Sequence, residues 1–147
     1  MASMRELANH IIAVANRNNL SVTNLQIQKV MFFSLGIHIR HHGIDDLARE
    51  TYDIPFDKWK YGPVVESVYY SFNHFKDNDI TEELEGSYIP DYARWDNAIG
   101  ALLNTDVFEL VRVSHDFSSW ADYEVDILSR NYVESYTLEE IAEDFET

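Results

Sequence analysis

Apolar residues recur along most of this chain at the three- and four-residue spacing of an amphipathic helix. The pattern predicts a first helix over about residues 4–17, with Ser3 as its N-cap. Thr23 and Gln26 have capping-box spacing and predict a second, longer helix that ends near Gly43. The apolar positions that define these two helical faces are Leu7, Ile11, Val14, Ile27, Val30, Met31 and Leu35.

The middle of the chain interrupts this helical pattern. Residues 52–57 are typical of a short extended piece, and a second short strand is expected near 80–90, so at most a small two-stranded β element is predicted. Gly62 and Pro63 predict a helix start, because the fixed φ of proline suits a first helical turn. That helix would run to about residue 75.

The last third returns to helical periodicity. Helices are predicted over about residues 91–104 and from 105–106 onward, and Thr137 with Glu140 forms a second capping-box pattern that opens the last helix. We therefore predict a mainly α fold, a compact bundle of about six to seven helices. Residues 1–147 show no linker or internal repeat, so a single domain is expected.

Composition narrows the class of protein. The chain has 147 residues with 46% hydrophobic content, enough for one sizeable core. It has no cysteine, which excludes disulfides and thiolate metal sites. The start has no basic segment followed by an apolar stretch, and no apolar run approaches the roughly 18 residues of a membrane span. We expect a cytoplasmic protein without membrane contact.

The negative charge is concentrated in the second half of the chain. The net charge is −15, and residues 77–147 hold three basic against nineteen acidic residues. Such a surface repels nucleic acid, so direct nucleic-acid binding is not expected, and it favours a basic protein partner. The alternative is a solvated acidic face that keeps the protein soluble.

Several motifs together resemble the Panacea domain, a family of small bacterial and phage proteins also described as SocA-like. Residues 22–33, which include Lys29, look like the family's lysine-bearing helix. Residues 56–65 are similar to its tryptophan–tyrosine–Gly-Pro-Val element. The later matches are Ser114-His115, Ser119-Trp120 and a closing helix over 137–145.

The resemblance implies a non-enzymatic binding protein without a cofactor. Panacea domains commonly act as antitoxins that neutralise a toxic protein by direct contact, and at least one branch presents its toxin to a protease. The implied partner is therefore a cognate toxin, with a host protease as a second partner. An alternative function is a phage or prophage-encoded regulator or proteolytic adaptor that acts on a host protein or mimics the charge of DNA.

Candidate site residues fall into two sets. The predicted partner-binding residues are Tyr61, Gly62, Pro63, Tyr69, Glu139 and Glu143. The predicted structural residues are Lys29, Trp59, His115 and Trp120, with His115 hydrogen-bonded near Trp120 and the Gly-Pro corner. Aromatic side chains at this corner are typical either of interface hot spots or of core anchors.

Histidines supply the weaker chemical candidates. His38 and His42 stand four apart, so a helix places them on one face, where they can bind a metal with Asp45 or Asp46. The alternative is a helix end at which imidazoles favour the negative end of the dipole. Ser114, His115 and Asp116 are adjacent and point in different directions, which argues against a catalytic relay.

Overall fold

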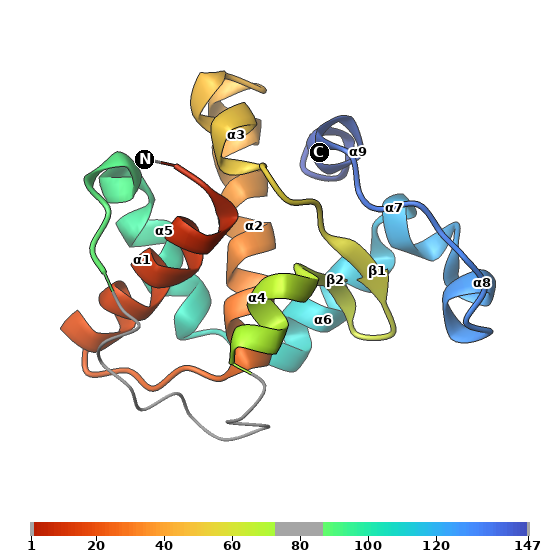
Figure 1. Ribbon diagram of the computed structural model, residues 1–147, viewed down its shortest axis with the longest axis horizontal. Coiled ribbons are helices and arrows are strands. Elements are labelled where there is room, and N and C mark those ends of the chain that lie inside the picture. The colour runs from red at the N-terminus through yellow and green to blue at the C-terminus, as the bar shows by residue number, and fades with distance from the viewer. Residues whose placement is uncertain (1, 73–86, 147) are drawn as a thin grey trace.

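The computed structural model of the protein describes residues 2–72 and 87–146, and helix α2 (Asn24–His42) runs through its centre (Figure 1). Helices α1 (Met4–Arg17) and α5 (Asp96–Leu103) lie on one side of it, and α6 (Val107–Asp116) lies on the other side with the small sheet. The mainly α fold is confirmed. Within the described ranges there are nine α-helices, more than predicted.

The first two helices begin where their capping residues predict. The Ser3 hydroxyl accepts a hydrogen bond from the Glu6 amide at 3.0 Å. At α2 the capping box is complete, because Gln26 N donates to Thr23 Oγ1 at 3.2 Å and Thr23 N donates to Gln26 Oε1 at 2.9 Å. Gly43 ends α2 with a φ of 75°, a left-handed conformation that favours glycine.

The β element differs in place from the prediction. Strand β1 (Asp57–Trp59) pairs antiparallel with β2 (Gly62–Val64), so the partner strand is not the segment 80–90, of which residues 80–86 lie outside the described residues. The predicted helix start at Gly62-Pro63 is therefore wrong, and helix α4 (Glu66–Ser71) begins later, at Glu66. Both strands of a two-stranded sheet are edge strands, and an edge strand tolerates Pro63 because the missing N–H can be the one that faces away from the partner strand.

Short helices account for most of the remaining differences. Helix α3 (Asp46–Thr51), capped by Asp45, lies in a segment with no helix prediction. Two more unpredicted helices, α7 (Ser118–Ala121) and α8 (Glu124–Leu128), follow α6. The helix predicted over 91–104 is divided into the 3₁₀-helix η3 (Pro90–Trp95) and α5.

Helix α9 (Leu138–Asp144) closes the fold and begins with the predicted capping box of Thr137 and Glu140. An aromatic cluster joins it to α2 and to the chain before β1. The Phe32 ring of α2 has its centroid 5.4 Å from Phe56, 5.3 Å from Tyr136 and 5.6 Å from Phe145. These edge and tilted contacts hold the hairpin and α9 against the same face of α2.

No helix within residues 2–72 and 87–146 combines the length and the apolar character needed to cross a bilayer.

Candidate functional site

The hairpin between β1 and β2 reverses direction at Lys60 and Tyr61. Neither turn residue has a positive φ, so the reversal is completed by Gly62, whose φ is 100°. A turn followed by a left-handed glycine is a common way to close a short hairpin. This geometry places the Tyr61 side chain at the tip, where 52% of its surface is exposed.

Behind the tip, a buried lysine holds β2 against α2. The Lys29 ammonium donates a hydrogen bond to the carbonyl oxygen of Pro63 at 2.8 Å, and the residue is fully buried. Burial removes the water that stabilises the charge and lowers the pKa of Lys29 from 10.5 to about 7. The predicted structural role of Lys29 thus takes a specific form, a link between the long helix and the hairpin.

Helix α6 packs equally closely against the hairpin. A Cβ atom on Gly62 would lie 2.6 Å from Ser114 Oγ and 3.4 Å from Lys29 Cε. Ser114 itself is buried and donates to the carbonyl of Val111 at 2.8 Å. Glycine is therefore required at residue 62 both by the backbone conformation and by the space available.

The side of the hairpin is held by Trp120 of α7. Its indole N–H donates to the carbonyl oxygen of Trp59 at 2.8 Å, and the His115 ring stacks on its face at a centroid distance of 3.8 Å. Burial lowers the pKa of His115, and a hydrogen bond with the Lys60 backbone acts in the opposite direction. His115 lies where the sequence predicted, beside Trp120 and the Gly-Pro corner.

The neighbours of His115 have partners of their own. Ser114 is bonded to the α6 backbone, and the Asp116 carboxylate lies 3.1 Å from Arg112 Nη1. The three adjacent side chains thus form separate contacts, as their positions on a helix predicted.

Tyr61 and Tyr69, the two tyrosines predicted to face a partner, line one groove of about 510 Å³, which we call the hairpin groove. Its full lining comprises Asn24, Leu25, Trp59, Lys60, Tyr61, Val64, Tyr69 and Phe108. The half-buried Trp59 ring meets Tyr69 edge-on at 5.1 Å, and Phe108 of α6 is 62% exposed. The groove is thus a mostly apolar surface on a firmly held hairpin.

The remaining predicted contact residues at this corner need a correction. Gly62 and Pro63 form part of strand β2 of the hairpin, and both are buried, so neither is exposed to a partner. Their part is to shape the turn that exposes Tyr61. The sequence analysis also missed Phe108, because one exposed phenylalanine on an amphipathic helix carries no distinct signal.

The carboxylates of α9 divide into two groups. Glu139 and Glu143, the two residues predicted to contact a partner, are exposed. Glu140 closes the capping box and accepts a hydrogen bond from Lys58 Nζ at 3.0 Å. Asp144 is buried and accepts a hydrogen bond from the Ser119 hydroxyl. Burial raises the pKa of Asp144 to about 6.

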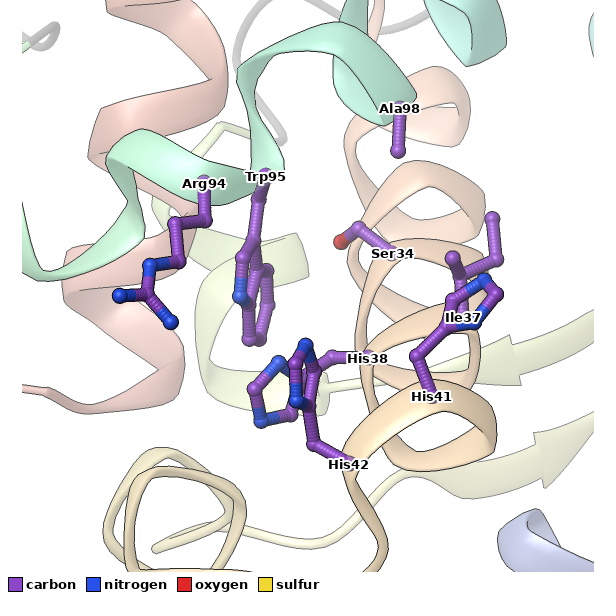
Figure 2. Close-up of a pocket in the computed structure, with 8 residues that line it drawn as sticks. All are labelled: Ser34, Ile37, His38, His41, His42, Arg94, Trp95 and Ala98. Atoms are coloured by element: carbon purple, nitrogen blue, oxygen red, sulfur yellow. The ribbon is translucent and has the colours of Figure 1, made fainter.

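The histidine pair lies at the far end of α2, in a small pocket of about 80 Å³ (Figure 2). The rings of His38 and His42 lie side by side with centroids 4.8 Å apart, Trp95 packs 5.0 Å from His38, and His41 points elsewhere. His38 Nε2 is 3.0 Å from both carboxylate oxygens of Asp45. The same-face prediction is correct. In the described part of the chain, no group of three histidine or carboxylate side chains is placed to hold a metal ion.

No protein-family model, no curated protein sequence and no solved structure matches this chain.

Proposed function

We propose that this protein is a non-enzymatic, cytoplasmic antitoxin that neutralises a cognate toxin by direct contact through the hairpin groove. One observation carries the proposal: a rigidly held hairpin exposes a groove with aromatic walls. Tyr61 and Phe108 are 52% and 62% exposed, and Tyr70, whose ring contacts those of Trp59 and Tyr69, is 57% exposed. Aromatic side chains supply much of the binding energy of protein interfaces, and grouped exposed apolar side chains mark such interfaces.

Rigidity is the second argument for this surface. Two hydrogen bonds of 2.8 Å hold the hairpin: Lys29 Nζ donates to the carbonyl oxygen of Pro63 in β2, and Trp120 Nε1 donates to that of Trp59 in β1. Little backbone entropy is then lost when a partner binds, because the turn that carries Tyr61 is already fixed. The resemblance to Panacea domains, which rests on these same residues, gives the partner class, a toxic protein.

The exposed carboxylates of Glu139 and Glu143 extend the proposal to the charge of the partner. Both lie on α9, outside the lining of the hairpin groove, so they act through the long-range field of the protein, which accelerates association with a basic protein and suppresses association with an acidic one. We expect the association rate, and not the dissociation rate, to fall when these two residues are replaced by glutamine. Stopped-flow binding at low and high salt measures this.

The test of the proposed function is growth rescue by co-expression with the product of the adjacent gene, which this proposal makes the toxin. Wild-type protein should restore growth, and Tyr61→Ala with Tyr69→Ala should not. Tyr132→Ala is the matched control, since Tyr132 is 88% exposed and lies outside the hairpin groove. Circular dichroism and urea unfolding verify that each variant is folded.

Full rescue by the folded Tyr61/Tyr69 double variant would remove the hairpin groove as the binding surface. Immunoblotting of the toxin during rescue separates two modes of action. A constant toxin level indicates neutralisation by contact, whereas a falling level indicates delivery to a protease.

A further inference from the structure

A second groove lies on the opposite flank of the hairpin, between it and α8, which projects from the edge of the fold (Figure 1). This α8 groove has a volume of about 630 Å³ and is lined by residues 58–60 together with Ile127, Leu128, Arg130 and Val133. Trp59 and Lys60 line both grooves, so the hairpin tip is a ridge between them.

Half of the residues that line the α8 groove are apolar: Trp59, Ile127, Leu128 and Val133. Helix α8 buries only Ile127, whereas Leu128 is 51% exposed at the groove. Val125 and Tyr132, just outside the lining, are 77% and 88% exposed. A short helix with this much exposed apolar surface offers an anchor site for an aliphatic side chain.

The charge of the α8 groove is opposite to that of the protein. Among the described residues that line it, three are lysine or arginine and none is acidic, in a chain of net charge −15. Lys58 is neutralised by Glu140 at 3.0 Å. Lys60 and Arg130 have no carboxylate partner in the described ranges. Helix α8 carries two acidic residues, Glu124 and Asp126, outside the lining, and Asp126 accepts a hydrogen bond from Asn131.

We propose that the α8 groove binds an extended acidic segment of a protein partner. An aliphatic side chain of that segment packs between Trp59 and Leu128, and carboxylates on either side of it meet Lys60 and Arg130. Charge complementarity selects this occupant, because a basic segment would meet two unpaired cations. The negative field of the protein opposes any anion, but a nucleic acid carries a charge on every phosphate and has no aliphatic side chain to place between Trp59 and Leu128, so it fits this groove less well than a short acidic segment. The inference does not require that the partner be a toxin.

The experiment uses labelled synthetic peptides and fluorescence anisotropy. The acidic peptide carries glutamates on both sides of one leucine in an otherwise uncharged extended sequence, and its matched counterpart carries lysines instead. The acidic peptide should bind the intact protein, more weakly as salt rises, and the lysine peptide should not. Amide chemical shifts should change at residues 58–60 and 127–133.

Variants identify the groove. Lys60→Glu with Arg130→Glu should weaken binding of the acidic peptide at least about tenfold, since two attractions become repulsions. Arg40→Glu with Arg49→Glu makes the same change in net charge at exposed positions elsewhere and should leave affinity within about twofold. Leu128→Ser should also weaken binding, whereas Val125→Ser, outside the lining, should not.

Three results would overturn the proposal: no binding of the acidic peptide, equal losses in the two charge-reversal variants, or equally tight binding of an oligothymidylate at the same residues. The outcome is independent of the antitoxin proposal. Of the two grooves, Arg130 lines only the α8 groove. If the Arg130→Glu variant no longer binds the acidic peptide but still restores growth, the two surfaces act separately.

Discussion

Replacing Lys29 by methionine should change how the stability of this protein depends on pH. The Lys29 ammonium is completely buried, and its hydrogen bond to the Pro63 carbonyl is made without a carboxylate partner in the described ranges. Burial lowers its pKa from 10.5 to about 7. Methionine has a similar length and flexibility, and it removes both the titrating group and the hydrogen bond.

The sign of the effect follows from proton binding. Above the folded pKa of Lys29, the folded protein has lost the proton that the unfolded chain retains up to about pH 10.5. The unfolded state then binds more protons, so the free energy of unfolding rises with pH through this window. One pKa unit corresponds to roughly 1.4 kcal/mol, which gives about 5 kcal/mol over the whole window and about 2 kcal/mol between pH 7 and pH 9.

The methionine variant lacks this rise. At high pH it should be less stable than the wild type, because the buried Pro63 carbonyl loses its partner, at a cost of about 1–3 kcal/mol. At pH 6 its deficit should shrink or reverse, because the wild type then holds a buried charge. The difference in unfolding free energy between the two proteins should grow by about 2 kcal/mol from pH 7 to pH 9.

Urea unfolding followed by tryptophan fluorescence between pH 6 and pH 9 measures this difference. Burial raises the pKa values of Tyr52, Tyr92 and Tyr136, which lowers stability at high pH, but both proteins share those tyrosines. Lys60→Met, at an exposed lysine, is the control and should parallel the wild type. A constant difference between wild type and Lys29→Met across this range would show that Lys29 keeps the same protonation on folding.

Two further predictions concern the same half of the molecule. Gly62→Ala should lower the free energy of unfolding by about 2–4 kcal/mol in urea, since a left-handed alanine costs roughly 1–2 kcal/mol and its Cβ would also lie 2.6 Å from Ser114 Oγ. Gly43→Ala is also left-handed but has open space around its Cβ, so it should lose only the roughly 1–2 kcal/mol of backbone strain. The raised pKa of Asp144 means that the folded protein binds the extra proton between pH 3.8 and about 6, so stability should fall by about 3 kcal/mol as pH rises through that window. Asp144→Asn should lack this fall in the same assay, and an unchanged pH profile would contradict the buried-carboxylate explanation.

The candidate site was partly predictable from the sequence, residue by residue. Tyr61 and Tyr69 were expected to face a partner, and they line one groove. His115 and Trp120 were expected in contact, and they stack at 3.8 Å. Gly62 and Pro63 were expected to contact a partner, but both are buried in β2. The helix start predicted at the same pair is wrong, because a Gly-Pro pair is equally compatible with a helix start and with an edge strand.

The α8 groove was not predictable. Two of its apolar residues, Ile127 and Leu128, come from the five-residue helix α8. Its excess of basic residues arises only when residues near 59 and near 130 lie together in the fold. Individually, Lys60 and Arg130 are isolated bases in an acidic chain. A pattern along the sequence cannot report that, in the described part of the chain, neither of these two bases is paired with a carboxylate.

The sequence by itself determined helices α1, α2 and α9, because each begins with a capping contact between residues three positions apart. Such bonds form within one turn and depend little on the rest of the chain. Only the tertiary structure decided the hairpin and its two grooves. Lys29 reaches Pro63 across 34 positions and Trp120 reaches Trp59 across 61, and contacts at that separation exist only after α2, α6 and α7 have packed around the turn.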